Sequence, residues 1–173
     1  MSDARTRTYT WEDPLGAIEG TAGLSGLEVM QRMASGELAR PPIADTLGFR
    51  LVAAERGRAV FECEPAEFHY NPIGTVHAGL ASTLLDSAMG CAFVTTLEQL
   101  VGWTTLELKA NFTRPLTADT GLVRCTGSVI HPGRTIVTTE ARLEDADGRL
   151  YAHGTSTILV LGPRAVDGTG HER

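Results

Sequence analysis

The chain has 173 residues, of which 42% are hydrophobic and 21% are charged, proportions typical of one globular domain with its own core. The formal net charge of −6 disfavours nucleic acid or an anionic membrane as a partner, because both repel an acidic surface. No uncharged apolar run reaches the roughly 18 residues of a membrane-spanning helix, and residues 1–14 lack the apolar core of a secretory signal. We therefore expect a cytoplasmic protein that binds neither nucleic acid nor membrane.

Residues 1–42 are expected to form an N-terminal extension. Residues 1–25 are polar and glycine-rich, which indicates a poorly packed lead-in. A short amphipathic helix is predicted after them, ending near Gly36, because apolar residues recur there at helical spacing: Leu27, Met30 and Met33.

The main domain is expected over residues 43–162. It begins with two short strands that are joined around the ERGR sequence at 55–58. The run from Gly79 to Phe93 is apolar nearly all round, which indicates a buried helix. Asp86 is the one formal charge in this run, and a carboxylate buried there is costly unless it is paired or hydrogen-bonded.

The second half of the main domain reads as four strands. Residues 104–115 alternate with a period of two, and one face carries Leu106, Leu108, Ala110 and Phe112. Three more strand-like runs follow, separated by the turn sequences HPGR and DADGR. Short connections between consecutive strands favour an antiparallel meander. The pattern predicts an α+β domain whose sheet curls around one buried helix, with a disordered tail over residues 163–173.

One face of the predicted central helix is small and polar. It carries Gly79, Ser82, Asp86 and Gly90. Small residues permit close approach of another backbone, so a second copy of the chain is expected to cover this face. The alternative is that these residues pack against a loop of the same chain.

Asp86 also allows two interpretations. It is either a structural carboxylate that binds backbone groups, or a catalytic one, since buried carboxylates in clefts are candidates for acid–base or nucleophilic work. Ala78 stands where the helix begins, and the free N–H groups there suit developing negative charge. An ordinary first-turn alanine explains the same residue. Taken alone, His77 is a loop histidine and Asn71 before Pro72 is common turn chemistry.

Other chemistries have little support in the sequence. The motifs GxSxG, GxxxxGK[ST], GxGxxG and HExxH are all missing. The histidines and cysteines do not follow a zinc pattern. The cysteines have no CxxC pair and are interpreted as reduced thiols: Cys63, Cys91 and Cys125. We expect no metal and no tightly bound cofactor.

The order of strands and helix, together with the spacing of Asn71, Gly74, His77, Gly79 and Asp86, resembles the hotdog-fold acyl-CoA thioesterases. The phenylacetic-acid-pathway (PaaI-like) branch is the most similar, over residues 43–161, and the strand sequence TLELKANFTRP is similar to that branch too. The chain departs from the family in one respect, since Ala78 replaces the first glycine of the usual His-Gly-Gly.

The resemblance implies a function: hydrolysis of an acyl-CoA to a free carboxylic acid and CoA. Asp86 would activate water or attack the thioester carbonyl, and the backbone amide of Ala78 would polarise that carbonyl. Asn71 would hold the water or the carbonyl, and His77 would orient the thioester or its loop. Thr105, in preference to its neighbour Thr104, would hold the water or the carboxylate. Contacts with the substrate are expected from Gly79, Arg114 and Arg134, the arginines as partners for the CoA phosphates.

Ala78 and Asp86 are eight residues apart, which is about 12 Å along one helix and too far for both to serve one thioester. The resemblance implies two helices side by side across a two-fold axis, with Asn71, His77 and Ala78 facing the partner's carboxylate and threonine. A homodimer or a dimer of dimers is therefore expected. The acyl group stays open between aryl-acetyl, hydroxybenzoyl and medium aliphatic chains. A hotdog hydratase or dehydratase and a non-catalytic acyl-CoA-binding sensor domain are the alternative functions.

Overall fold

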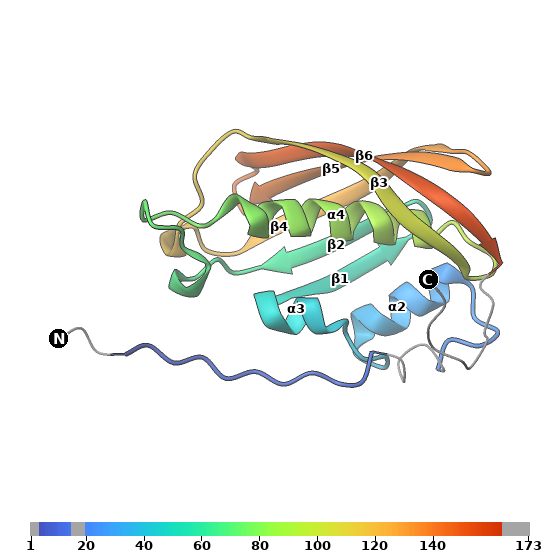
Figure 1. The fold of residues 1–173 in the computed structure, drawn as a ribbon, viewed down its shortest axis with the longest axis horizontal. Helices are drawn as coiled ribbons and strands as arrows, with labels where there is room; N and C mark the ends of the chain where they lie inside the picture. The colour runs from blue at the N-terminus through green and yellow to red at the C-terminus, as the bar shows by residue number, and fades with distance from the viewer. Residues whose placement is uncertain (1–3, 15–19, 164–173) are drawn as a thin grey trace, which may run out of the picture.

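The computed structural model describes residues 4–14 and 20–163. Its elements in chain order are α2 (Gly26–Ser35), α3 (Pro42–Leu47), β1 (Phe49–Glu55), β2 (Arg58–Cys63), the 3₁₀ turn η1 (Glu67–His69), α4 (Ala78–Val94), β3 (Val101–Phe112), the 3₁₀ turn η2 (Ala118–Thr120), β4 (Val123–Pro132), β5 (Ile136–Asp145) and β6 (Leu150–Pro163). One antiparallel sheet curls around α4, while α2 and α3 lie beside β1 (Figure 1). The α+β prediction is confirmed.

The sheet has six strands in the order β1-β2-β4-β5-β6-β3. The expected meander is correct for β4, β5 and β6, which pair in sequence, but it is wrong for β3. That strand pairs with β6 at the edge of the sheet, and residues 113–122 carry the chain across to β4 beside β2. The reason is that β3 and β4 are joined by a connection long enough to span the sheet, so sequence adjacency does not force them to pair.

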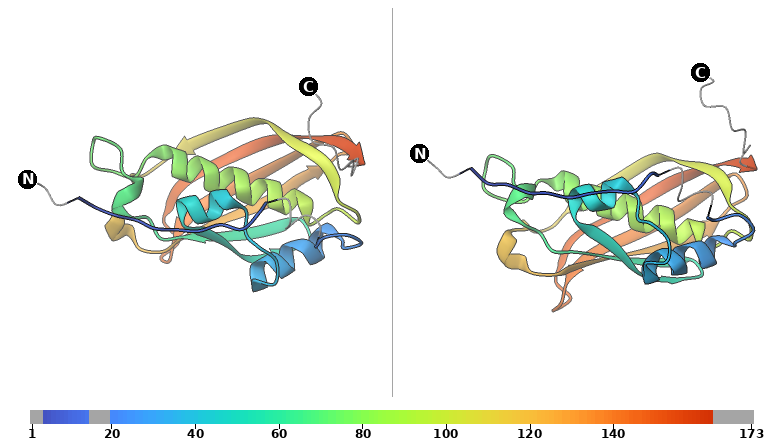
Figure 2. Two further views of the ribbon diagram at one scale, coloured as in Figure 1. Left: turned by 60° about the horizontal axis from the view of Figure 1, so that its bottom comes forward. Right: turned by 90° about the horizontal axis from the view of Figure 1, so that it is seen from below.

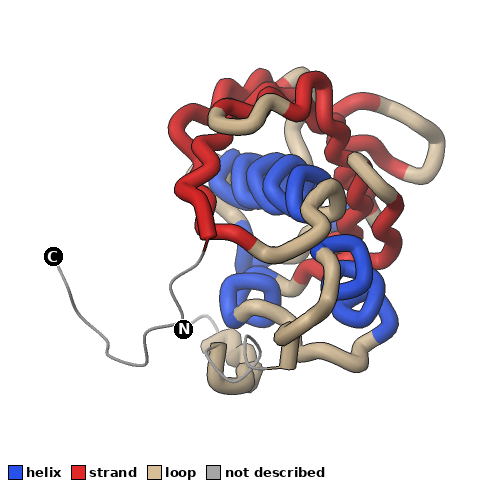
Figure 3. Tube along the Cα trace, turned by 90° about the vertical axis from the view of Figure 1, so that its right-hand side faces the viewer, coloured by secondary structure: helices blue, strands red, loops and turns tan. Residues whose placement is uncertain are grey.

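The central helix lies in the concave face of the sheet, as the end-on view in Figure 3 shows. Leu84, Leu85, Ala88 and Met89 are completely buried. A Cβ at Gly127 of β4 would lie 2.2 Å from the Ala88 carbonyl oxygen, so glycine there lets the helix and the sheet approach closely. The prediction of a buried helix from Gly79 is confirmed within one residue.

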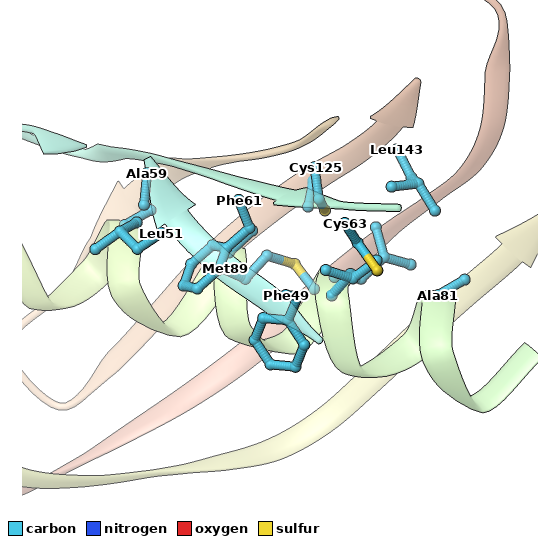
Figure 4. Close-up of a cluster of buried hydrophobic side chains, with 14 of the residues drawn as sticks. Phe49, Leu51, Ala59, Phe61, Cys63, Ala81, Met89, Cys125 and Leu143 are labelled. Carbon is cyan, nitrogen blue, oxygen red and sulfur yellow. The ribbon is translucent and has the colours of Figure 1, made fainter. Parts of the chain in front are cut away.

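The core beneath this helix is built from strands that precede α4 in the chain and strands that follow it. Phe49 and Phe61, on β1 and β2, meet edge to face with ring centroids 5.7 Å apart, and Met89 lies beside them in Figure 4. Apolar side chains of β4 and β5 complete the layer, among them Cys125 and Leu143. These buried contacts fix the position of α4 on the sheet.

The short helix predicted near Leu27 is α2. Ser25 caps it, its hydroxyl accepting from the Glu28 amide, and Gly36 ends it with a φ of 84°. The sequence does not predict α3, since the two expected strands leave no place for a helix between residues 43 and 55. Pro42 at the first helical turn and Gly48 at φ 72° begin and end this helix instead.

The lead-in over residues 4–14 is exposed and runs across α3, as Figure 2 shows. Arg7 nevertheless ties it down: its guanidinium donates to the Thr46 and Asp45 carbonyls and lies 4.1 Å from the Phe68 ring centroid. The tail was predicted over residues 163–173; Pro163 is instead the last residue of β6, and residues 164–173 lie outside the described residues. No helix within the described ranges is both long and apolar enough to cross a membrane.

The alternation predicted for β3 is partly wrong. A β-bulge between Thr105 and Glu107 interrupts its register with β6, so Trp103 and Thr105 point inward before the bulge, and Leu108 and Ala110 after it. Leu106, the extra residue, is 56% exposed, and Phe112 at the strand end is 50% exposed. The bulge shifts the inward-facing positions from odd to even residue numbers, and a polar residue at the inward position before it, Thr105, hides this shift in the hydrophobic pattern.

Candidate active site

The first turn of α4 carries free backbone hydrogen-bond donors. His77 is the N-cap, and its Nδ1 accepts from the Gly79 amide at 2.9 Å. A Cβ at Gly79 would lie 2.8 Å from that nitrogen, so a side chain there would displace the cap. No partner for the Ala78 N–H is found among the described residues. The turn therefore offers one unpaired amide, at its positive dipole end, to a ligand.

The loop before the helix is shaped by Asn71. Its Oδ1 accepts from the Ile73 amide at 3.0 Å, and its Nδ2 donates to the Thr75 hydroxyl at 3.1 Å. Gly74 closes the loop at a φ of 81°. The ordinary turn chemistry expected of Asn71 is thus present, and one Nδ2 hydrogen is left for a ligand.

Four of the predicted site residues line one cavity of about 290 Å³: Asn71, His77, Ala78 and Arg114. The opposite wall comes from the end of β3 and the start of β6, including Phe112 and Tyr151. Sequence reasoning missed Tyr151, because only the pairing of β6 with β3 brings it there. The cavity combines an apolar wall with an exposed cation at its rim.

Asp86 and Thr105 form a second cluster, at the middle of α4. The Thr105 hydroxyl donates to Asp86 Oδ1 at 2.9 Å, whereas Thr104 points outward. The Asp86 side chain is partly exposed in the single chain, so the expectation of a buried carboxylate is wrong at this level. No described residue donates to its Oδ2, which leaves one oxygen free to act on a ligand.

The two clusters are separate in the single chain. Asp86 and Thr105 do not line the cavity that contains Ala78, and eight helical residues span about 12 Å. Arg134 lies apart from both clusters, in the turn between β4 and β5. This turn is at the end of the sheet that is next to the C-terminus of α4, where the Gly57 amide donates to the Thr95 hydroxyl. The chain thus carries two separate clusters of candidate residues on one helix, called half-sites below.

The helix face that was expected to meet a partner is covered in part by the chain itself. A Cβ at Gly90 would lie 2.6 Å from Cη2 of Trp103, so Gly90 packs against its own β3. Gly79, Ser82 and Asp86 remain partly exposed. For Gly90 the expectation of a partner is wrong: the covering segment belongs to the same chain, although it is the strand β3 and not a loop as the alternative had it.

The cysteines are no rival nucleophiles. Burial, with a smaller contribution from the Asp86 carboxylate, raises the pKa of the Cys91 thiol to about 12. Burial also raises the pKa of Cys63 to about 11 and that of Cys125 still further. All three are free thiols that stay protonated near neutral pH. Within the described ranges, His, Cys, Asp and Glu form no group that could hold a metal ion.

Comparisons with known proteins identify the family of this chain. A family model described as the thioesterase superfamily matches residues 73–152, a range that contains His77, Ala78, Asp86 and Thr105 but begins after Asn71. Human acyl-coenzyme A thioesterase 13 is 32% identical over 108 residues, covering 62% of this chain and 76% of its own. The 1,4-dihydroxy-2-naphthoyl-CoA hydrolase of Listeria monocytogenes is 29% identical over 118 residues, covering 68% and 94%.

Among solved structures, a phenylacetic acid degradation-related protein from Ralstonia eutropha superposes with a TM-score of 0.68 at 31% identity, covering 76% of this chain and 98% of that one. The resemblance stated from the sequence is therefore confirmed. The chain belongs to the thioesterase superfamily, as a PaaI-like hydrolase with the hotdog fold.

Proposed function

We propose that the protein hydrolyses an acyl-CoA thioester to a carboxylic acid and CoA. The observation that carries this proposal is the pair of half-sites on α4: an unpaired amide at Ala78 inside a cavity, and a carboxylate at Asp86 oriented by Thr105. An oxyanion donor and a base or nucleophile are the two groups that acyl transfer from a thioester needs. The names of the human and Listeria relatives, which both refer to coenzyme A esters, support CoA as the leaving group.

In the proposed reaction the thioester oxygen accepts from the Ala78 amide. Asp86 Oδ2 takes a proton from water, which attacks the carbonyl carbon, or Asp86 attacks that carbon itself and water cleaves the resulting anhydride. In the first route the C–S bond then breaks, and the proton that the carboxylate has taken up passes to the CoA thiolate. In the second route the C–S bond breaks as the anhydride forms, and the water that cleaves the anhydride restores the carboxylate and supplies the proton for the thiolate. Thr105 holds Oδ1 and so leaves the other oxygen aimed at the reactants.

The active site is proposed to form between two chains. Each Ala78 cavity would receive Asp86 and Thr105 of the partner subunit, which removes the separation of about 12 Å. Two features support a partner there: the partly exposed stripe of Gly79, Ser82 and Asp86, and the outer edge of β3, which pairs with β6 on one side alone. A dimer or a dimer of dimers satisfies this geometry.

The remaining roles follow from position. Asn71 and His77 would hold the thioester from the cavity side, and Gly79 keeps the cap in place. Arg114 at the cavity rim is the candidate for a CoA phosphate, whereas Arg134 could reach a substrate only from another subunit. The catalytic unit is proposed to span residues 43–162, with 1–42 as its extension. The protonated free thiols suit a reducing, cytoplasmic compartment.

The test measures free thiol release across an acyl-CoA panel of aryl-acetyl, hydroxybenzoyl, dihydroxynaphthoyl and medium aliphatic chains. We expect turnover on at least one class, and no hydration when an enoyl-CoA is supplied. Enoyl-CoA hydration without thiol release would indicate a hydratase. Tight acyl-CoA binding without any turnover would indicate a sensor domain.

A further inference from the structure

His69 is a buried histidine that the proposed reaction does not use. It lies in η1 and is 7% exposed. Its Nδ1 accepts from the Ala66 amide at 3.0 Å, and its Nε2 lies 2.8 Å from the carbonyl oxygen of Leu47 at the end of α3. Because an N–H points at Nδ1, that nitrogen must present its lone pair, and the proton belongs on Nε2, where a carbonyl accepts it.

The same residue holds the start of α4 through its backbone. The His69 carbonyl accepts from the His77 amide at 2.8 Å. His77 in turn caps the helix, and the next residue carries the unpaired amide. The position of the Ala78 N–H thus depends on where the His69 backbone lies, and the ring ties that backbone to α3 and to Ala66.

We propose that neutral His69, in the Nε2–H tautomer, is a positioning residue for the Ala78 amide. Its catalytic consequence rests on the proposed function. Protonation of Nδ1 would set two donors face to face and release the Ala66 bond. Burial lowers the pKa of His69, the hydrogen bond to the Leu47 carbonyl raises it by less, and the nearby Arg7 guanidinium lowers it further. The neutral ring is therefore the favoured form near neutral pH.

The side chain can be dissected with three variants. His69→Asn keeps an acceptor near the place of Nδ1, His69→Gln keeps a donor near the place of Nε2, and His69→Leu keeps neither. We expect kcat per folded molecule to fall about tenfold in His69→Leu with KM nearly unchanged, because a displaced oxyanion donor weakens the transition state. The kcat values of His69→Asn and His69→Gln should lie between those of His69→Leu and the wild type. His131→Leu, at an exposed histidine of β4, is the matched control and should keep kcat.

Two structural measurements accompany the kinetics. Nitrogen-15 shifts of the His69 ring should show a protonated Nε2 and an unprotonated Nδ1 at pH 7, and exchange of the His77 amide should quicken in His69→Leu. If His69→Leu does not fold, the Asn and Gln variants carry the same comparison. Wild-type kcat in the folded variants, the opposite tautomer, or unchanged exchange at His77 would overturn the inference. A wild-type protein with no thiol release overturns the proposed function instead, while the ring shifts and the exchange rates still decide the positioning role.

Discussion

The start and the middle of α4 contribute to the candidate site in different ways. At the start, the proposed functional group is the Ala78 backbone N–H, and side chains shape the loop that presents it. In the middle, the proposed functional group is the Asp86 side chain, which accepts a hydrogen bond from Thr105 on the neighbouring edge strand. A half-site made of backbone tolerates changes of residue type as long as the helix begins at the same place, whereas a half-site made of a carboxylate does not.

This difference explains how alanine can replace the family's glycine at position 78 in the proposed site. The family pattern has glycine at this position, but an amide donor is common to both residues. The identity of residue 78 should matter through its N–H and through the space that its methyl occupies in the cavity. The identity of residue 86 should matter through its charge.

Asp86→Asn is expected to have the largest effect. The amide keeps the shape of the side chain but cannot take a proton or act as the nucleophile, so kcat should fall by about 10²–10⁴-fold. Thiol release per folded molecule and a thermal melt separate chemistry from stability. The control is Asp147→Asn, in the exposed β5–β6 turn, which should leave the rate of thiol release and the melting temperature unchanged. Near-wild-type turnover in Asp86→Asn would contradict the role of Asp86 as base or nucleophile.

Ala78→Pro tests the other half-site. Proline suits the first position of a helix, and His77 at φ −63° and ψ 134° already has the extended conformation that precedes proline. The fold should survive, while the loss of one N–H should lower kcat by about 10²–10³-fold. Ala78→Gly is the matched control because it keeps the amide, and we expect kcat within about threefold of wild type. Full activity in a folded Ala78→Pro variant would exclude this amide as the oxyanion donor.

Mixing the two inactive variants asks whether the half-sites combine between chains. Asp86→Ala and Ala78→Pro each disable one half-site, so a heterodimer has one site with both halves intact. A statistical mixture should regain about a quarter of wild-type activity, because half of the dimers are mixed and each has one working site of two. Subunit exchange is verified by native mass spectrometry of differently tagged chains. Exchange without recovery would place the site within one chain or show that the two sites fail together.

Thr105→Val is expected to have the smallest effect of the four. Valine keeps the branched shape on β3 but removes the hydroxyl that donates to Asp86 Oδ1. A carboxylate that is free to rotate is aimed less well, and kcat should fall about tenfold. Thr104→Val is the control, since that neighbouring side chain is exposed and should have no effect on kcat. An equal fall of kcat in Thr105→Val and Thr104→Val would mean that the substitutions disturb the whole of β3.

Local chemistry was sufficient to predict much of this protein. The apolar run after Gly79 predicts a buried helix, which the structure confirms. Asp86 stands out as the one charge in that run, although its side chain is partly exposed in the single chain. The end of α2 at Gly36 and the turns between β4, β5 and β6 also depend on residues close in sequence, and the structure confirms them. The spacing of Asn71, His77 and Asp86 was readable for the same reason, since one loop and one helix carry all three.

Contacts between distant segments were decided by the tertiary structure alone. The edge position of β3, the bulge that exposes Leu106, and the packing of Trp103 on Gly90 all depend on which strands meet around α4. Tyr151 and Arg114 face one cavity because β6 pairs with β3, although thirty-seven residues separate them in the chain. Periodicity reports which side of an element is apolar, but it carries no information about the element that covers that side. The sequence therefore determined the helix and its carboxylate, and the packing of the sheet determined which side chains surround them.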